Sequence, residues 1–136
     1  QEIVPFEDIV ILNDAYNASP SSIEKSLETF SKIYNERNIK KIIVLGDMLE
    51  LGENELKYHA DIYDVLKNVK FDSIYLFGER IKSLFDRIEK ESLQNKEVIY
   101  FEKKTEIKEK IKGIEGKKVV LLKASRGIKL EEIIEE

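Results

Sequence analysis

The chain has 136 residues, 42% of them hydrophobic, which suits one domain with a single sizeable core. Charged residues make up 37% of the sequence but nearly balance at a formal net charge of -4, so neither a nucleic-acid nor a membrane partner is expected. The absence of cysteine excludes disulfides and thiolate metal sites. No apolar run approaches the roughly 18 residues of a membrane span, and no signal peptide is recognisable, so a cytoplasmic protein is expected.

Five apolar runs have the length of strands and are rich in β-branched residues. In chain order they are Ile9–Leu12, Ile42–Leu45, Ile74–Phe77, Val98–Phe101 and Val119–Leu122. Most are continuous rather than alternating, which is typical of strands buried on both faces of a parallel sheet. Ile3–Phe6 could add a short strand, at a sheet edge because Pro5 is tolerated only there.

Amphipathic helices are predicted between these strands, because apolar side chains recur there every three or four residues. Their apolar stripes, interpreted as core, are Ile23, Leu27, Phe30 and Tyr34; Leu56, Ala60, Tyr63 and Leu66; Ile81, Leu84, Phe85 and Ile88; and Ile107, Ile111 and Ile114. Leu130, Ile133 and Ile134 indicate a short final helix. This alternation predicts one α/β domain over residues 1–136, a three-layer, Rossmann-like, doubly wound and mostly parallel sheet of five or six strands.

In such a fold, ligands bind beyond the carboxyl ends of the strands. Three of these ends carry unusual residues: "NDAYNASPSS" after the first strand, "GDMLELGENE" after the second and "KASRG" after the fifth. The other two ends, "FGER" and "FEKK", are ordinary by comparison. The sequence therefore predicts one working edge built from the first, second and fifth loops.

The first loop combines a helix start with residues that a helix start does not need. Ser19 can cap the helix while Pro20 occupies its first position, where the missing N–H costs nothing. A cap leaves Asp14, Tyr16 and Asn17 unexplained. Asn17 could simply support a turn. Asp14 could accept hydrogen bonds from the next loop or from a pair of ribose hydroxyls.

The second loop contains two carboxylates and is followed by the only histidine. Asp47 and Glu50 could cap the next helix or bind a metal, but two carboxylates without further ligands are weak evidence, and no metal site is predicted. Leu51-Gly52 closes a short turn before that helix. His59 lies near the apolar stripe of the helix, where a lone histidine is usually structural.

The fifth loop, Lys123-Ala124-Ser125-Arg126-Gly127, places two cations and a hydroxyl at a strand terminus before a helix. An arginine fork and a helix N-terminus suit a carboxylate or a phosphate, and a surface salt bridge is the alternative.

Motifs for nucleotide hydrolysis are missing from the sequence. The closest text to a P-loop, Gly113-Ile114-Glu115-Gly116-Lys117-Lys118, has the wrong spacing and precedes a strand. No G-x-G-x-x-G follows the first strand, and no nucleophile elbow is present. The 136 residues by themselves are therefore expected to be inactive in ATP hydrolysis.

Taken together, the three loops resemble the C-terminal domain of the Mur ligases, and within that family the branch that adds D-alanyl-D-alanine. The pattern of that branch runs D-D-[SA]-Y-N-A-N-P-x-S, then V-L-G-D-M-x-E-L-G with a downstream His, then K-G-S-R. The order and spacing agree from Ile9 to the final helix, and "GDMLELG" is the most specific part. Asn13, Ser19 and Ala124 depart from the pattern.

The resemblance implies an ATP-dependent amide ligase of peptidoglycan precursor synthesis, whose partners are a UDP-N-acetylmuramoyl tripeptide and D-alanyl-D-alanine. It also implies that a central domain holds most of the ATP and Mg²⁺ and that an N-terminal domain holds UDP. Both domains are absent from the 136 residues. A monomer in which this domain acts as a lid is expected.

The resemblance also implies roles for individual residues. By position, Asp14, Tyr16 and Asn17 would bind ATP. Lys123, Ser125 and Arg126 would bind the substrate. Asp47, Glu50 and His59 belong to the family signature without an assigned role.

Three alternatives remain at this point. A signalling receiver domain fits poorly, because Asp47 ends the second strand rather than the third and Ala124, not proline, follows Lys123. A related ligase such as a folylpolyglutamate synthase is disfavoured by "GDMLELG". A stand-alone nucleotide- or peptide-binding module without ligase activity is compatible with the same loops.

Overall fold

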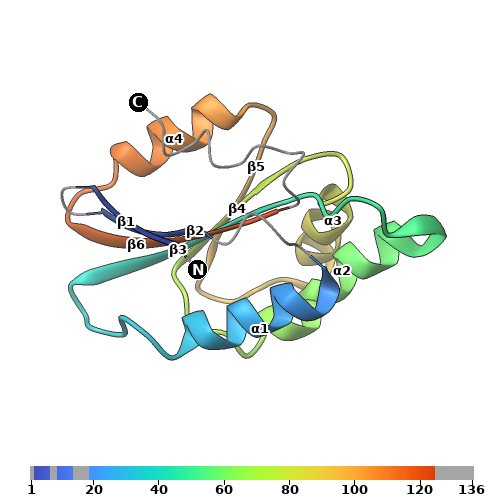
Figure 1. Cartoon of the computed structure of the whole chain (residues 1–136), viewed down its shortest axis with the longest axis horizontal. Helices are drawn as coiled ribbons and strands as arrows, with labels where there is room; N and C mark the ends of the chain where they lie inside the picture. The colour runs from blue at the N-terminus through green and yellow to red at the C-terminus, as the bar shows by residue number, and fades with distance from the viewer. Residues whose placement is uncertain (1, 7–8, 14–18, 125–136) are drawn as a thin grey trace.

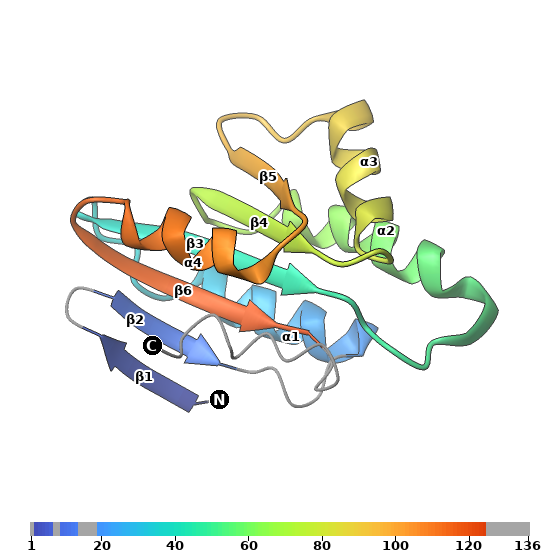
Figure 2. The same ribbon diagram turned by 90° about the horizontal axis from the view of Figure 1, so that it is seen from above.

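The computed structural model of the chain describes residues 2–6, 9–13 and 19–124. Within these ranges six strands form one sheet in the order β1-β2-β6-β3-β4-β5 (Figures 1 and 2). The strands are β1 Glu2–Phe6, β2 Ile9–Asn13, β3 Ile39–Gly46, β4 Ser73–Phe77, β5 Glu97–Phe101 and β6 Lys117–Lys123. Only the pairing of β1 with β2 is antiparallel. The predicted mostly parallel sheet is confirmed, and the edge strand that contains Pro5 lies at the sheet edge.

Helices cover both faces of the sheet, as the prediction of three layers requires (Figure 1). They are α1 Pro20–Ser31, α2 Glu55–Leu66, α3 Lys82–Glu91 and α4 Lys104–Lys112, with a short 3₁₀ helix, η1 Gly52–Asn54, before α2. In β3, Ile43 and Leu45 pack in the cluster under α1, α2 and α3, whereas Ile42 and Val44 pack in the cluster under α4. This double burial explains why the strands are continuously apolar.

The start of α1 agrees with the prediction, but its end does not. The Ser19 hydroxyl accepts a hydrogen bond from the Ser22 N–H at 3.3 Å, and the Ser22 hydroxyl accepts one from the Ser19 N–H at 2.9 Å, which forms a capping box. Pro20 occupies the first turn. The helix ends at Ser31, so Tyr34 lies beyond it with a φ of 52°. Tyr34 still packs against the core, from a loop.

The apolar stripe of α2 differs from the predicted one. Leu56, expected in the core, is 55% exposed, and the buried residues of the helix are His59, Ile62, Tyr63 and Leu66. Leu56 belongs to the first turn of α2, which extends past the carboxyl ends of the strands (Figure 2). Regular spacing alone could not show where the helix leaves the sheet.

No helix among the described residues is long and apolar enough to cross a membrane. The predicted final helix around Leu130, Ile133 and Ile134 lies outside the described residues.

Lys41 joins the start of β3 to the end of α1. Its side chain is buried, and Nζ donates hydrogen bonds to the Phe30 carbonyl at 2.6 Å and to Asn35 Oδ1 at 2.9 Å. Nζ also lies 4.6 Å from the centroid of the Phe30 ring. The Lys41 N–H donates to Asp72 Oδ2 at 2.8 Å. Burial lowers the pKa of the Lys41 ammonium to about 8, although Asp72 opposes the shift.

This shift predicts a pH-dependent stability. Between pH 8 and 10.5 the folded chain has released the Lys41 proton while the unfolded chain still holds it, so the free energy of unfolding rises with pH. Lys41→Met removes this contribution. The wild type should therefore gain stability relative to Lys41→Met as pH rises from 8 to 10, by at most about 1.4 kcal/mol per pH unit.

Urea denaturation of both proteins across that pH range measures the difference. Lys40→Met, at the neighbouring position of β3, is the matched control and should follow the wild-type slope. Parallel pH dependence of Lys41→Met and the wild type would contradict the role given to the Lys41 ammonium.

Candidate functional site at the carboxyl edge of the sheet

The sheet order brings together the three strand ends that the sequence singled out. β6 lies between β2 and β3, with Leu122 opposite Asn13 and Lys123 opposite Leu45. The first, second and fifth loops therefore leave from neighbouring strands, as predicted. Five predicted site residues lie outside the described residues: Asp14, Tyr16, Asn17, Ser125 and Arg126.

Asp47 follows β3 and is buried, with 3% of its surface exposed. Its Oδ1 accepts a hydrogen bond from the Ile81 N–H at 2.8 Å, and Oδ2 lies 3.3 Å from Arg80 Nη1. Ile81 is the N-cap residue of α3. Asp47 therefore binds the start of α3, and the prediction that it caps the next helix, α2, is wrong. The reason is the pairing of β3 with β4, which places the loop after β4 beside this carboxylate.

The loop after β4, "FGER", is part of this network, although its sequence looks ordinary. Arg80 Nε donates to Glu55 Oε2 at 2.7 Å, so Arg80 bridges Asp47 and the first turn of α2. The hydrogen bond to Glu55 raises the pKa of the Arg80 guanidinium further above its ordinary value. Gly78 has a φ of +128°, and a Cβ there would lie 2.2 Å from Asp47 Oδ1. The only local signal for this role is a glycine directly after a strand, and its meaning depends on knowing which strand is adjacent.

His59 fixes the backbone of the second loop. The side chain is fully buried, Nε2 accepts a hydrogen bond from the Met48 N–H at 2.8 Å, and Nδ1 lies 2.6 Å from the Glu55 carbonyl oxygen. Because the Met48 amide is the donor, Nε2 is the acceptor and Nδ1 carries the proton that binds Glu55. This geometry agrees with the structural interpretation of the lone histidine. It links the turn of "GDM" to the helix that follows it.

The positions of Glu50 and Lys123 do not indicate a role for either residue. Glu50 is exposed with a φ of 62°, and it makes no hydrogen bond or ion pair with another described residue. Lys123 ends β6 and is 2% exposed, so its contact with a substrate stays a prediction.

Within residues 2–6, 9–13 and 19–124, no cluster of three His, Asp or Glu side chains could hold a metal ion. Among the described residues of this edge, the buried carboxylate is Asp47, which is already bonded to Ile81 and Arg80. The described residues therefore do not fit a Mg²⁺ site, and no chemical step is assigned to them.

The fold and this edge define the class of the protein: a doubly wound α/β domain with polar loops at the carboxyl ends of β2, β6 and β3. The family profile described as "Mur ligase, glutamate ligase domain" matches residues 1–126. The chain belongs to this family, which confirms the resemblance found in its loops.

Curated relatives carry the name of one ligase of the family. The UDP-N-acetylmuramoyl-tripeptide--D-alanyl-D-alanine ligase of Bacillus subtilis is 35% identical over 126 residues, covering 93% of this chain and 27% of that protein. The protein of the same name from Borreliella burgdorferi is 34% identical over 134 residues, covering 98% and 28%. The chain thus spans a little over a quarter of the length of these relatives.

Solved structures support the fold. A MurF ligase from Thermotoga maritima in complex with ADP superposes with a TM-score of 0.77 at 24% identity, over 98% of this chain and 29% of that one. A MurF from Acinetobacter baumannii gives 0.79 at 20% identity, over 98% and 29%.

The close approach of Gly78 to Asp47 predicts a large cost for Gly78→Ala. The added Cβ meets the carboxylate at 2.2 Å, so the Asp47 cap of α3 must shift. Gly116→Ala is the matched control, because Gly116 has a φ of +88° and nothing within 4 Å of the added Cβ. We expect Gly116→Ala to cost about 1–2 kcal/mol from backbone strain alone, and Gly78→Ala at least about 2 kcal/mol more.

Chemical denaturation measures both variants, and a double-mutant cycle separates the contact from the strain. In an Asp47→Ala background the extra cost of Gly78→Ala should largely disappear. If it persists there, the carboxylate is not its cause.

The bond between His59 and Met48 predicts a local effect of His59→Leu. Leucine fills the buried site but accepts no hydrogen bond, so the Met48 N–H loses its partner at a cost of about 1–3 kcal/mol. Hydrogen exchange of the Met48 amide should accelerate beyond the change in global stability. Tyr63→Phe is the control on the same helix, since it loses only the hydroxyl's bonds to the carbonyl oxygens of the exposed Glu91 and Ser92. Unchanged relative exchange at Met48 in His59→Leu would refute the positioning role.

Proposed function

We propose that this chain is the C-terminal domain of a UDP-N-acetylmuramoyl-tripeptide–D-alanyl-D-alanine ligase, a cytoplasmic enzyme that works as a monomer. The observation that carries the proposal is the 35% identity to the Bacillus subtilis enzyme across 93% of this chain. The edge from which the family's signature loops leave supports it, because β2, β6 and β3 are neighbours there. A related ligase such as a folylpolyglutamate synthase is disfavoured by "GDMLELG".

In the proposed reaction, the terminal carboxylate of the tripeptide attacks the γ-phosphorus of ATP, so that an acyl phosphate forms and ADP leaves; Mg²⁺ held by the central domain would neutralise charge. The amine of D-alanyl-D-alanine then attacks the carbonyl carbon of the acyl phosphate. A C–N bond forms, the C–O bond to phosphate breaks, and the amine proton is lost. Central and N-terminal domains, which the 136 residues do not contain, would hold most of ATP, Mg²⁺ and UDP. The contribution of this domain is positioning.

Residues of the carboxyl edge would divide this work. Asp14, Tyr16 and Asn17 would face ATP, with Asp14 on the ribose. Lys123, Ser125 and Arg126 would face the carboxylate of D-alanyl-D-alanine, for which an arginine fork is well suited. Asp47, His59 and Arg80 would hold the second and third loops in place, through the contacts to Ile81, Met48 and Glu55. Glu50 receives no role.

A domain exchange tests the proposal. The segment of the Bacillus subtilis ligase that matches this chain is replaced by residues 1–126, and release of ADP is measured with and without D-alanyl-D-alanine. A chimera with the matching segment of the Borreliella burgdorferi protein, at 34% identity to this chain, controls for the exchange itself. We expect both chimeras to consume ATP only when the tripeptide and D-alanyl-D-alanine are present.

Point variants of the chimera assign the two ligand sides. Asp14→Ala should raise the KM for ATP, and Arg126→Ala should raise the KM for D-alanyl-D-alanine, each by about tenfold or more. Lys25→Ala, at an exposed position of α1, should change neither. A folded chimera that stays inactive while the control chimera works would favour a stand-alone binding module instead.

A further inference from the structure

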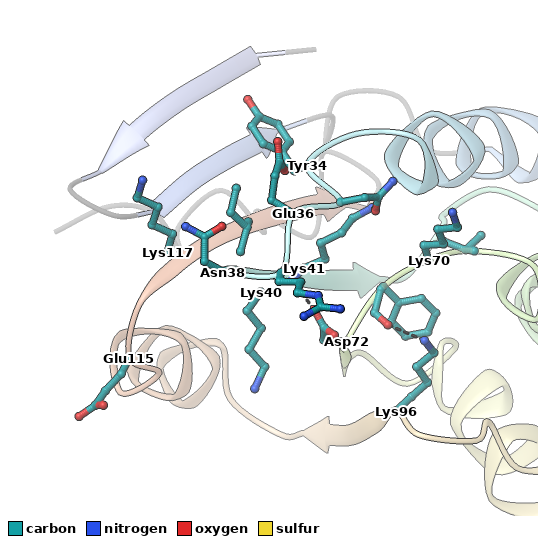
Figure 3. A pocket seen from close by; sticks show the side chains of 15 residues that line it. Tyr34, Glu36, Asn38, Lys40, Lys41, Lys70, Asp72, Lys96, Glu115 and Lys117 are labelled. Atoms are coloured by element: carbon teal, nitrogen blue, oxygen red, sulfur yellow. Dashed lines mark hydrogen bonds between the residues drawn. The ribbon is translucent and has the colours of Figure 1, made fainter.

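A pocket of about 580 Å³ opens at the edge of the sheet opposite to the candidate site (Figure 3). It is formed where β3, β4, β5 and β6 begin, together with the loop that follows α1. We call it the amino-edge pocket. Its cationic lining residues are Arg37, Lys40, Lys41, Lys70, Lys96 and Lys117. Its volume lies within the roughly 300–1,000 Å³ of small-molecule sites.

The charge of the amino-edge pocket is opposite to that of the chain. Six cations line it against three acids, Glu36, Asp72 and Glu115, whereas the whole chain has a net charge of -4. One carboxylate oxygen of Asp72, Oδ2, already accepts a hydrogen bond from the Lys41 N–H. Glu115 lies at the far end of the pocket, away from Asp72 (Figure 3). The local excess is therefore a feature of this edge and not of the composition.

Two of the six cations have partners within the protein. Lys41 binds the carbonyl oxygen of Phe30 and the side chain of Asn35. Lys96 Nζ donates to the Phe71 carbonyl at 2.6 Å and lies 4.8 Å from the centroid of the Phe71 ring. These two lysines satisfy backbone acceptors, so the structure explains them without a ligand.

The other four cations are not explained in this way. The side chains of Arg37, Lys40, Lys70 and Lys117 form no hydrogen bond or ion pair with any residue that the structure describes. They come from three stretches of the chain, because Arg37 and Lys40 lie together at the start of β3, and Figure 3 shows Lys40, Lys70 and Lys117 on different sides of the pocket. Like charges held around one pocket repel one another, and a bound anion offsets this electrostatic repulsion. Lys70 and Lys96 also contribute to the lowered pKa of Lys41, as neighbouring cations do.

We propose that the amino-edge pocket binds a small polyanion with two or more phosphate groups, in which Arg37, Lys40, Lys70 and Lys117 supply the contacts. Several dispersed cations match a ligand whose charge is divided among several oxygens. The pocket lies at the amino ends of the strands, so this site is separate from the nucleotide side proposed at the carboxyl edge. It does not depend on the proposed ligase activity.

Inorganic pyrophosphate is the first probe, titrated into the full 136-residue chain at about 150 mM NaCl and followed by amide NMR and calorimetry. We expect saturable binding with a Kd below about 1 mM, and amide shifts centred on Lys40, Lys70 and Asp72. Shifts centred elsewhere, or no saturation by about 10 mM, would overturn the proposal.

Matched pairs of variants separate a built site from general charge. Lys40→Ala combined with Lys70→Ala should weaken pyrophosphate binding about tenfold or more. Lys25→Ala combined with Lys90→Ala removes the same charge from exposed positions of α1 and α3 outside the pocket lining, and should change the Kd less than about twofold. Equal losses in both pairs would reduce the pocket to nonspecific attraction and overturn the proposal.

Two further ligands identify the source of the phosphates. Orthophosphate should bind more weakly than pyrophosphate, because it presents one phosphate group to a site that surrounds two or more. If ADP produces the same shifts at Lys40 and Lys70, the natural ligand carries its phosphates on a nucleotide. If ADP shifts only residues at the carboxyl edge, such as Asp47 and Met48, the amino-edge ligand is a polyanion without a nucleoside.

Discussion

The insertion of β6 between β2 and β3 is the constraint on which the rest of the structure depends. β6 is formed by residues 117–123, yet it pairs with a strand that begins at Ile9 and with another that begins at Ile39. Its Val119 and Leu121 face the cluster under α1, α2 and α3, and its Val120 and Leu122 face the cluster under α4. Without β6 neither face of the sheet is continuous, and the first and second loops have no common edge. Contacts this distant in sequence slow folding, because the entropy of loop closure is lost before the contacts form.

At the carboxyl edge, the loops that follow the paired strands β3 and β4 are connected to each other by polar side chains. Asp47 follows β3 but binds the start of α3, the helix after β4. Arg80 follows β4 but binds Glu55 of α2, the helix after β3. The two contacts cross, so the second and third loops, which follow β3 and β4, hold each other in position. The buried carboxylate is stable because its oxygens accept a backbone N–H and face a guanidinium. The same contact requires glycine at position 78, since any side chain there would occupy the space of the Asp47 carboxylate.

The sequence predicted those features that depend on local chemistry. Continuous apolar runs located the buried strands, Pro5 identified an edge strand, and Ser19 with Pro20 marked the start of α1. The prediction failed where a neighbour in space decides the outcome. Leu56 continues the spacing of a core stripe but lies past the end of the sheet.

The candidate site was predictable to the same degree. The spacing of its loops indicated the family and the edge, but the part played by "FGER" depends on β4 lying beside β3, which no local pattern contains. The prediction that Asp47 caps α2 was wrong for the same reason. Asp14, Tyr16, Asn17, Ser125 and Arg126 lie outside the described residues, so their roles still rest on the resemblance.

The two edges of the sheet differ in how their charges are balanced. At the carboxyl edge, the Arg80 guanidinium lies between two carboxylates, 3.3 Å from Asp47 Oδ2 and 2.7 Å from Glu55 Oε2. At the amino edge, Lys41 and Lys96 donate hydrogen bonds to the backbone carbonyl oxygens of Phe30 and Phe71. Four more cations then surround the same pocket without an acidic partner among the described residues. Stability alone favours fewer like charges at such a place, because each added cation raises the repulsion. Their accumulation is therefore better explained by a ligand that supplies the missing negative charge than by the fold.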